Sequence, residues 1–278
     1  MNERPFSLSD LSVAATTALI PLVAHARART LFPELGFADE PAERMVEALG
    51  VPLDLFGANH GWLRATILRA GWFDDRCMAF FAANPGGLGV SLGAGLDTRC
   101  QRLDAGATRW VDLDLPEVIA LKGRFVKATR DYRLLACDVT DRTWADRVGW
   151  RPGMPLCLIA EGLLMYLAPS DVRTLFGDIA ARFSQGPAPV SFLFDYASPF
   201  LVLNSRFHPA LMHTDARFRW GLGRAEAIRL IDPRYEVVED YDISRDCGYP
   251  TAMVSLMHQL MTMGRPLYGL AHVRLDGR

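Results

Sequence analysis

The sequence predicts a doubly wound α/β fold with a mostly parallel β-sheet. After residue 85, apolar runs of strand length recur, and most lack the polar alternation of a half-exposed strand. Segments with helical spacing separate these runs, and strand–helix alternation is typical of βαβ units. A chain of 278 residues, half of them hydrophobic and 22% charged, is long enough to bury the core of such a sheet.

The first part of the chain, residues 1–85, predicts a helical extension in front of the sheet. Helices are expected over residues 11–29, 41–49 and 60–83, where apolar side chains recur at helical spacing between Pro and Gly punctuation. Gly71 interrupts the third of these and marks either a kink or a break between two helices.

The middle and end of the chain predict the strands. Runs of strand length cover residues 88–92, 109–113, 132–137, 156–160 and 190–194, with helical segments at 115–129 and 171–183. Residues 197–222 are rich in aromatics and His and predict a lid-like insert after the fifth strand. A helix, a strand, a second helix and a final strand are expected over residues 224–231, 235–241, 250–263 and 267–275. This ending, residues 223–278, is expected to complete the sheet with an antiparallel C-terminal strand.

A Gly-x-Gly turn, Gly93-Ala94-Gly95, follows the first strand. Glycine is needed where a nucleotide approaches the backbone closely, because a Cβ would block it. The dinucleotide fingerprint needs a third glycine at position 98, where this chain has Thr98. The turn therefore favours a nucleoside without phosphates over NAD, and the alternative is a tight turn that binds nothing.

Acidic residues follow the strands at the edge where ligands bind. Asp97 follows the first strand, and Asp112 and Asp114 lie about 20 positions after the turn, where a carboxylate accepts bonds from ribose hydroxyls. Asp114 is favoured because it lies nearer the carboxyl edge. Asp138 and Glu161 follow the third and fourth strands. Any one of them alone is equally well interpreted as a helix cap, but the repetition on four strands predicts a binding site.

Several motifs together resemble the leucine carboxyl methyltransferase family, in particular its bacterial branch of polyketide O-methyltransferases. The motifs are Thr17-Ala18-Leu19-Ile20-Pro21-Leu22 with Arg27, Phe37-Ala38-Asp39 with Ala42, Arg69 with Asp74, Leu92-Gly93-Ala94-Gly95-Leu96-Asp97-Thr98-Arg99, Asp112-Leu113-Asp114-Leu115-Pro116, and Ala160-Glu161-Gly162-Leu163-Leu164-Met165-Tyr166-Leu167. The resemblance implies a Rossmann-like class I methyltransferase fold with seven strands in one domain over residues 1–278. One departure is Ala70, where many members of the family have Thr.

The resemblance also implies S-adenosyl-L-methionine as the cofactor, bound by the core at residues 86–196. It implies that Arg69 holds the cofactor carboxylate, that Asp114 binds the ribose, and that Glu161 lies near the amino group. The full set of expected cofactor-binding residues is Arg69, Gly93, Ala94, Gly95, Asp97, Asp114, Leu115, Asp138, Val139, Glu161 and Gly162.

The methyl acceptor is harder to predict, because methyl transfer mainly requires alignment and exclusion of water. A carboxylate acceptor needs no base, whereas a phenol benefits from one. Tyr166, Tyr196 and His208 are the candidates for the acceptor side, and each of the tyrosines is equally consistent with plain core. His60, His213 and Asp195 are further candidates for a base.

These observations predict an O-methyltransferase acting on a small-molecule carboxylate or phenol, in secondary metabolism. The alternatives are a protein C-terminal carboxyl methyltransferase and a non-catalytic cofactor-binding interaction protein, while Thr98 disfavours a dehydrogenase. The sequence does not exclude a nitrogen, sulfur or halide acceptor, and it does not predict the oligomeric state.

Composition excludes several other classes. A net charge of −2 without a basic block argues against nucleic acid as a partner, and no apolar run approaches the length of a membrane span. The N-terminus lacks the pattern of a signal peptide. Five scattered cysteines are typical of a reducing compartment, so a cytoplasmic location is expected, and no metal site is predicted.

Overall fold

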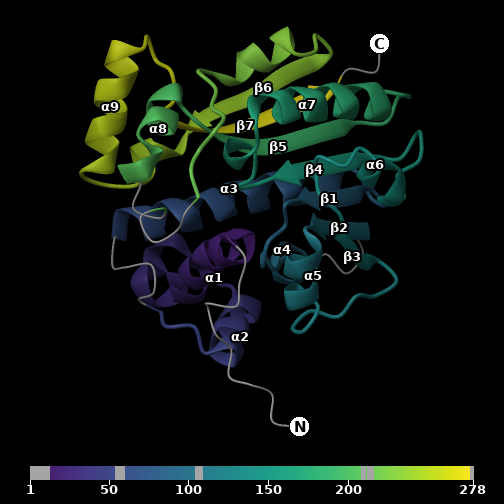
Figure 1. Ribbon diagram of the computed structural model, residues 1–278, viewed down its shortest axis with the longest axis horizontal. Coiled ribbons are helices and arrows are strands. Elements are labelled where there is room, and N and C mark those ends of the chain that lie inside the picture. The colour runs from purple at the N-terminus through teal and green to yellow at the C-terminus, as the bar shows by residue number, and fades with distance from the viewer. Residues whose placement is uncertain (1–12, 54–59, 104–108, 208–210, 212–215, 276–278) are drawn as a thin grey trace.

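A seven-stranded sheet forms the centre of the computed structural model (Figure 1), which describes residues 13–53, 60–103, 109–207, 211 and 216–275. The strand order is β3-β2-β1-β4-β5-β7-β6. The first five strands are parallel, and β7 pairs antiparallel with both β5 and β6. The strands are β1 (Leu88–Leu92), β2 (Arg109–Asp114), β3 (Tyr132–Ala136), β4 (Leu156–Ala160), β5 (Val190–Ala197), β6 (Tyr235–Asp242) and β7 (Tyr268–Leu275). The predicted mostly parallel sheet with an antiparallel end is confirmed.

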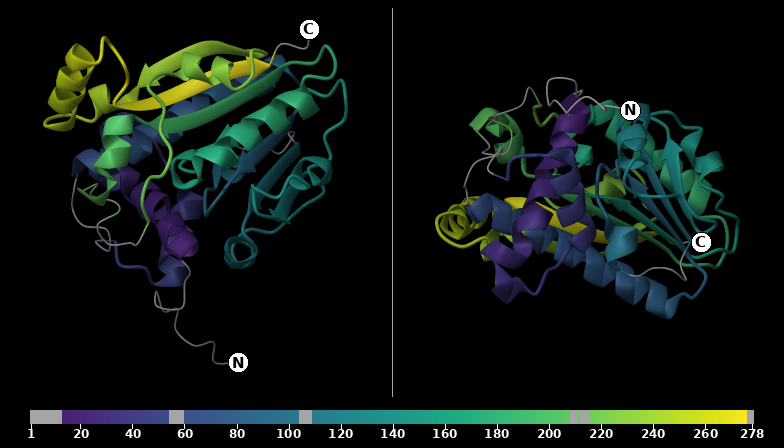
Figure 2. Two further views of the ribbon diagram at one scale, coloured as in Figure 1. Left: turned by 45° about the horizontal axis from the view of Figure 1, so that its top comes forward. Right: turned by 90° about the horizontal axis from the view of Figure 1, so that it is seen from below.

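Helices cover both faces of the sheet (Figures 1 and 2). The α-helices are α1 (Val13–Leu31), α2 (Glu40–Leu49), α3 (His60–Ala83), α4 (Arg99–Arg102), α5 (Pro116–Lys122), α6 (Trp144–Arg147), α7 (Pro169–Phe183), α8 (Pro199–Leu203) and α9 (Thr251–Met261). Short 3₁₀ turns lie at Pro33–Leu35, Leu164–Tyr166, Ser205–Phe207, Ala225–Leu230 and Ile243–Asp246. Among the described helices, none is both long and apolar enough to span a bilayer.

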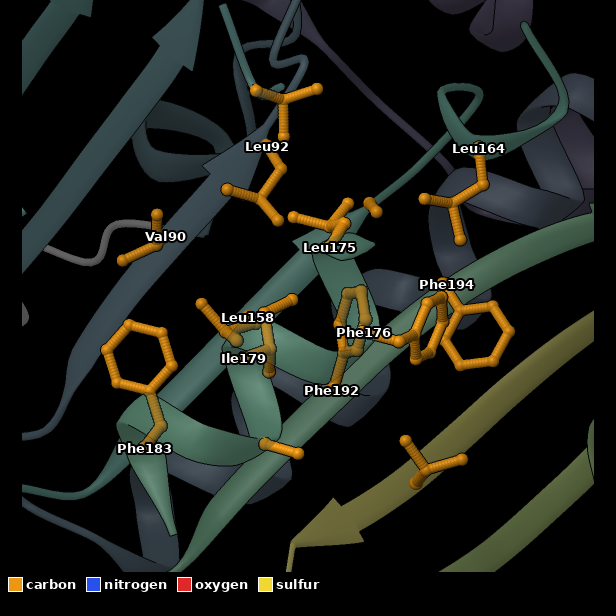
Figure 3. Close-up of a cluster of buried hydrophobic side chains, with 14 of the residues drawn as sticks. Val90, Leu92, Leu158, Leu164, Leu175, Phe176, Ile179, Phe183, Phe192 and Phe194 are labelled. Atoms are coloured by element: carbon orange, nitrogen blue, oxygen red, sulfur yellow. The ribbon is translucent and has the colours of Figure 1, made fainter. Parts of the chain in front are cut away.

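The core has one layer on each side of the sheet. On one face α7 packs Phe176 against Phe192 and Phe194 of β5, with ring centroids 5.2 Å apart in both pairs (Figure 3). On the other face α3 contributes Phe73 and Cys77 to a cluster with residues of β4 and β5, and α1 and α2 pack in the same cluster. Every residue of β1, β4 and β5 is buried, which explains why their sequences do not alternate.

Some element boundaries differ from the sequence prediction. The α3 helix runs without a break through Gly71, where a Cβ would meet open space, so the glycine is tolerated rather than required. The helix expected over 115–129 ends at Lys122, and the helix expected over 224–231 is a 3₁₀ segment.

The insert holds the short helix α8, and Arg219 N–H donates to Met165 O over 2.7 Å, which attaches the end of the insert to the segment after β4. Residues 208–210 and 212–215 of the insert lie outside the described part.

Candidate functional site

A cavity of about 790 Å³ lies at the carboxyl ends of β1 to β4, between the sheet edge, α1, α3 and the insert. Ligands of open α/β sheets bind at this edge. Its lining includes every residue that the sequence analysis expected on the cofactor side: Arg69, Gly93, Ala94, Gly95, Asp97, Asp114, Leu115, Asp138, Val139, Glu161 and Gly162. The topology therefore brings together side chains that are up to 93 positions apart (69 to 162) in the sequence.

The turn after β1 needs its glycines. Gly93 and Gly95 have φ of +61° and +51°, in the left-handed region that L side chains rarely adopt. A Cβ on Gly93 would also lie 2.7 Å from Leu163 Cδ1. The Ala94 N–H donates to Leu113 O over 3.0 Å, which ties the turn to β2. The turn is thus both conformationally and sterically restricted to glycine at Gly93.

Asp114 is held by the backbone on each side of its carboxylate. Gly95 N–H donates to Oδ2 over 2.6 Å and Leu115 N–H donates to Oδ1 over 2.7 Å. Burial raises the pKa of Asp114, although these two backbone bonds oppose the shift. Each oxygen of an ionised carboxylate has a second lone pair, so both can still accept one further hydrogen bond.

The end of β3 presents a different arrangement. Asp138 is exposed, and its Oδ1 accepts bonds from Thr140 N–H and Thr140 Oγ1, both over 2.8 Å. Val139 beside it is buried. Oδ1 thus acts as a local turn acceptor, while Oδ2 accepts no hydrogen bond from the described residues.

Glu161, after β4, lies between two guanidinium groups. Its Oε1 accepts from Arg69 Nε over 2.9 Å, and its Oε2 accepts from Arg99 Nη2 over 2.6 Å. Burial by itself raises the pKa of Glu161, but the charges of Arg99 and Arg69 outweigh it, so the pKa is lowered and the group is anionic at neutral pH. The Arg69 bonds use Nε and Nη1, and Nη2 forms no hydrogen bond within the described chain.

Asp195 lies one strand further and is completely buried. Its Oδ1 accepts from Gly162 N–H over 2.8 Å, and its Oδ2 accepts from Tyr268 OH over 2.6 Å and from Arg69 Nη1 over 3.1 Å. Burial raises the pKa of Asp195. Because three donors already occupy its oxygens, Asp195 orients Arg69 and the Gly162 backbone and is a poor candidate for a free base.

Two arginines that the sequence analysis did not single out complete this network. Arg99 is buried and donates to Asp74 on α3 and to Glu161, and its Nη1 lies 2.8 Å from Asp97. Arg102 donates to Asp74 and, through Nη1, to Asp39 over 2.6 Å. Both come from the short helix after the glycine turn. The signal available in the sequence was two basic residues, two and five positions after Asp97, whose buried partners only the fold brings close.

His25 of α1 was also missed. It is buried, it lines the cavity, and its Nδ1 lies 3.3 Å from Asp39 Oδ2. Its Nε2 is buried and has no hydrogen-bond partner among the described residues. His25, Asp39 and Asp97 offer three ligand atoms within 4.8 Å of one another, but Arg102 Nη1 lies 2.6 Å from Asp39 and 3.3 Å from Asp97. The arginine charge already compensates these carboxylates.

Of the acceptor-side candidates, Tyr166 lines the cavity and Tyr196 does not. Tyr166 contacts Phe218 of the insert edge-on, with ring centroids 5.5 Å apart, and burial raises its pKa to about 12. Its phenol is therefore protonated at neutral pH.

The expectation that Tyr196 lines the acceptor pocket was wrong. Successive residues of a strand point to opposite faces, so Tyr196 points to the face opposite that of Asp195, where it packs in the core cluster beneath α7. Its hydroxyl donates to Asp240 over 2.6 Å, and its ring fills the space above Gly269, where a Cβ would lie 2.1 Å from Tyr196 Cζ. His208 and His213 lie outside the described residues, and His60 is described only as the first residue of α3.

The rest of the cavity wall is mostly apolar and comes from α3, the insert, α8 and α9. Its apolar members include Trp62, Ala65, Leu201, Ala216, Phe218 and Val254, and the insert also contributes Arg217 and Arg219. The cavity therefore has a charged half at the strand ends and an apolar, partly aromatic half under the insert.

Comparisons with known proteins show which sequences this chain resembles. A family whose description is leucine carboxyl methyltransferase matches residues 20–180. The tetracenomycin polyketide synthesis O-methyltransferase TcmP of Streptomyces glaucescens is 27% identical over 212 residues, which cover 76% of each chain. A putative S-adenosyl-L-methionine-dependent methyltransferase of Mycobacterium marinum is 32% identical over 211 residues, covering 67% of this chain and 69% of the relative.

Solved structures match in fold. A putative S-adenosylmethionine-dependent methyltransferase from Listeria monocytogenes has a TM-score of 0.51 at 12% identity, covering 75% of this chain and 98% of its own. The magnesium protoporphyrin IX methyltransferase ChlM from Synechocystis, solved with bound S-adenosylhomocysteine, has a TM-score of 0.50 at 11% identity, covering 91% and 98%. The Rossmann-like class I methyltransferase fold expected from the sequence is confirmed.

Proposed function

Given that the chain belongs to the leucine carboxyl methyltransferase family and is an S-adenosylmethionine-dependent methyltransferase, we propose that it methylates an oxygen of a small apolar molecule. The acceptor oxygen belongs to a carboxylate or a phenol, and the reaction serves secondary metabolism. The observation that carries the proposal is the two-part cavity, charged at the strand ends and apolar beneath the insert. The name of the relative TcmP, a polyketide O-methyltransferase, supports oxygen as the acceptor atom.

Two features of this chain fit the cofactor. The left-handed turn at Gly93 leaves a cradle in which a Cβ would collide with Leu163, and the buried His25 Nε2 is a polar atom without a described partner. Arg69 Nη2 would donate to the carboxylate of the methionine portion, and the anionic Glu161 would accept from its amino group. The remaining lone pairs of Asp114 suit the two ribose hydroxyls, and Asp138 Oδ2 suits the adenine amino group.

When bound, the cofactor supplies a methyl group already activated by its sulfonium. The protein then has to orient the acceptor and exclude water. Tyr166, Phe218 and the apolar wall hold a flat or apolar acceptor, and the insert covers this half of the cavity.

The acceptor half favours a group that ionises without help. Tyr166 keeps its proton because its pKa is raised to about 12, and the oxygens of Asp195 are occupied by three donors. Neither is a suitable base at neutral pH. A carboxylate needs none, and an acidic phenol is partly ionised already, so both suit this wall better than an aliphatic alcohol.

The test is to incubate the protein with methyl-labelled cofactor and a panel of phenols, small apolar acids and peptides with free carboxyl termini. Calorimetry with S-adenosylhomocysteine and with NAD runs in parallel. We expect tight S-adenosylhomocysteine binding, no NAD binding, and transfer to members of the first two classes. Transfer only to peptide carboxyl termini, or to amines, would contradict the proposed acceptor.

A further inference from the structure

The helix α9 exposes its apolar face and buries its polar face, which is the reverse of an ordinary surface helix. Its side chains Met253, Leu256, Met257, Leu260 and Met261 follow the spacing i, i+3, i+4, i+7 and i+8, which makes one continuous stripe. All five are exposed, and Leu260 and Met261 are 76% and 81% exposed. An apolar stripe of this spacing normally faces a core, so here the stripe lacks a covering surface among the described residues.

The inward face of α9 is polar and well bonded. Ser255 is completely buried, and its Oγ donates to Asp242 Oδ2 over 2.8 Å. Gln259 Nε2 donates to the same oxygen over 2.8 Å, and Leu267 N–H donates to it over 3.0 Å. These bonds fix the rotation of the helix about its axis. The apolar stripe is therefore held outward by the structure and does not turn inward to hide.

The short helix α8 lies beside α9 (Figure 1), and it carries the exposed apolar side chains Phe200 and Leu203. The Phe200 ring of α8 packs against His258 of α9, with ring centroids 5.9 Å apart. We name as the α9 patch the exposed apolar side chains of both helices together with Met263, two residues after the end of α9: Phe200, Leu203, Met253, Val254, Leu256, Met257, Leu260, Met261 and Met263.

The α9 patch has the size of a protein interface. Its members are 44–82% exposed, and the patch area is on the order of 1,000 Å², where a standard interface buries about 800 Å² on each partner and monomer patches rarely exceed about 600 Å². A patch this large and this apolar resembles the interface of a homodimer more than that of a transient complex.

We propose that α9 is the interface of a homodimer, in which the α9 patch of one copy packs on the α9 patch of a second copy about a two-fold axis. A two-fold interface requires a surface that is complementary to itself. The α9 sequence, TAMVSLMHQLM, contains no Lys, Arg, Asp or Glu, so a second copy meets no like charge. Two such stripes pack as ridges into grooves.

The same features argue against a membrane surface as the occupant. Helices that lie in a bilayer interface have a polar face rich in Lys and Arg. The polar face of α9 carries Ser255 and Gln259 instead, and it is used against Asp242. The patch also borders the proposed active site, because Val254 both belongs to it and lines the cavity. The dimer would therefore support one wall of the acceptor half.

The experiment measures the mass of the full chain by sedimentation equilibrium and by light scattering across micromolar concentrations. We expect a dimer for the wild type and a monomer for the double variant Met257→Glu/Leu260→Glu. The matched control is Leu230→Glu, because Leu230 is 90% exposed but lies outside the patch, at the end of the 3₁₀ segment Ala225–Leu230. This control should remain a dimer. A monomeric wild type, or a double variant that stays dimeric, would overturn the proposal.

Further measurements keep the test decisive. Unchanged S-adenosylhomocysteine affinity and circular dichroism show that the double variant is folded. If it does not fold, Leu260→Cys replaces it. Mild oxidation should join two copies through this cysteine, whereas Leu230→Cys should stay uncrosslinked, and the reverse result would overturn the proposal.

Flotation with vesicles of phosphatidylcholine and phosphatidylglycerol completes the test. A wild type that is monomeric and binds these vesicles through the α9 patch would assign α9 to a membrane and overturn the dimer. The outcome does not depend on the acceptor, so it stands apart from the proposed function.

Discussion

The charged half and the apolar half of the cavity are held together by different kinds of contact. In the charged half, Glu161, Asp195 and Arg69 each make two or more charged or hydrogen-bonded contacts with residues from other elements. In the apolar half, Tyr166 and Phe218 meet edge-on and pack in a hydrophobic cluster with Met165. The first arrangement tolerates little movement and suits a ligand of one fixed structure. The second can adapt to the shape of an acceptor.

The largest expected effect is on the arginine network of the charged half. Arg99→Ala removes the buried cation that links Asp74, Asp97 and Glu161, and breaking a buried pair costs about 3–5 kcal/mol. Arg102 still contacts Asp74 and Asp97, and Arg69 still contacts Glu161, so we expect the lower end of this range. Urea unfolding followed by circular dichroism measures the free energy of unfolding. The control Arg142→Ala removes the exposed pair with Asp178 and should leave stability nearly unchanged. Equal losses of unfolding free energy in the two variants would show that the buried network contributes no more stability than an exposed ion pair.

A smaller loss is expected from the cofactor turn. Gly93→Ala places a Cβ at a φ of +61° and 2.7 Å from Leu163 Cδ1, and strain of this kind costs about 1–3 kcal/mol. We expect the S-adenosylhomocysteine Kd to rise at least about tenfold, which corresponds to 1.4 kcal/mol. Gly71→Ala is the matched control, because its Cβ meets open space in α3 and should leave Kd unchanged. Calorimetry distinguishes the two, and retained affinity in Gly93→Ala would remove the turn from the proposed site.

A substitution in the apolar half should weaken acceptor binding and leave cofactor binding unchanged, which is the opposite of the effect expected for Gly93→Ala. Phe218→Ala removes the ring that contacts Tyr166, and loss of pocket contact is worth about 1–3 kcal/mol. The acceptor KM should rise roughly tenfold while the S-adenosylhomocysteine Kd stays the same. Steady-state kinetics and calorimetry on the same preparation check this split. A collapse of cofactor affinity instead would mean that the two halves are one rigid unit.

The smallest effect is expected from the phenol of Tyr166. Burial raises its pKa to about 12, so the group keeps its proton throughout the ordinary assay range and does not act as a base. Tyr166→Phe should therefore leave the shape of the pH–rate profile unchanged from pH 6 to about pH 10. Loss of a titration step in the variant would assign Tyr166 a proton-transfer role.

Local patterns in the sequence predicted the parts of the site that lie on the backbone path. The run before Gly93, the two glycines and the acid about 20 positions later all follow from strand, turn and strand-edge chemistry. The position of Asp114 at the cavity edge agrees with that expectation, since the end of a parallel strand is where a ligand cavity forms. The role of each of these residues is still a proposal.

Residues that meet only through the fold were missed or misplaced. Arg99 carries no signature of burial in the sequence, because its partners Asp74 and Glu161 lie 25 and 62 positions away. Tyr196 follows Asp195 directly, and only the pleat of β5 decides which of the two side chains bonds to Arg69 and which packs in the core. The inverted polarity of α9 likewise depends on Asp242, which lies outside the helix.

The sequence by itself determined the order of strands and helices along the chain and the left-handed glycine turn, because these depend on periodicity and on backbone conformations that few residues adopt. Its motifs indicated the family. The tertiary structure alone decided how the carboxylates and guanidinium groups pair, which tyrosine reaches the cavity, and which face of α9 points outward. Those features depend on the relative positions of elements far apart in the chain, and pairing energies between buried groups are set by distance and burial.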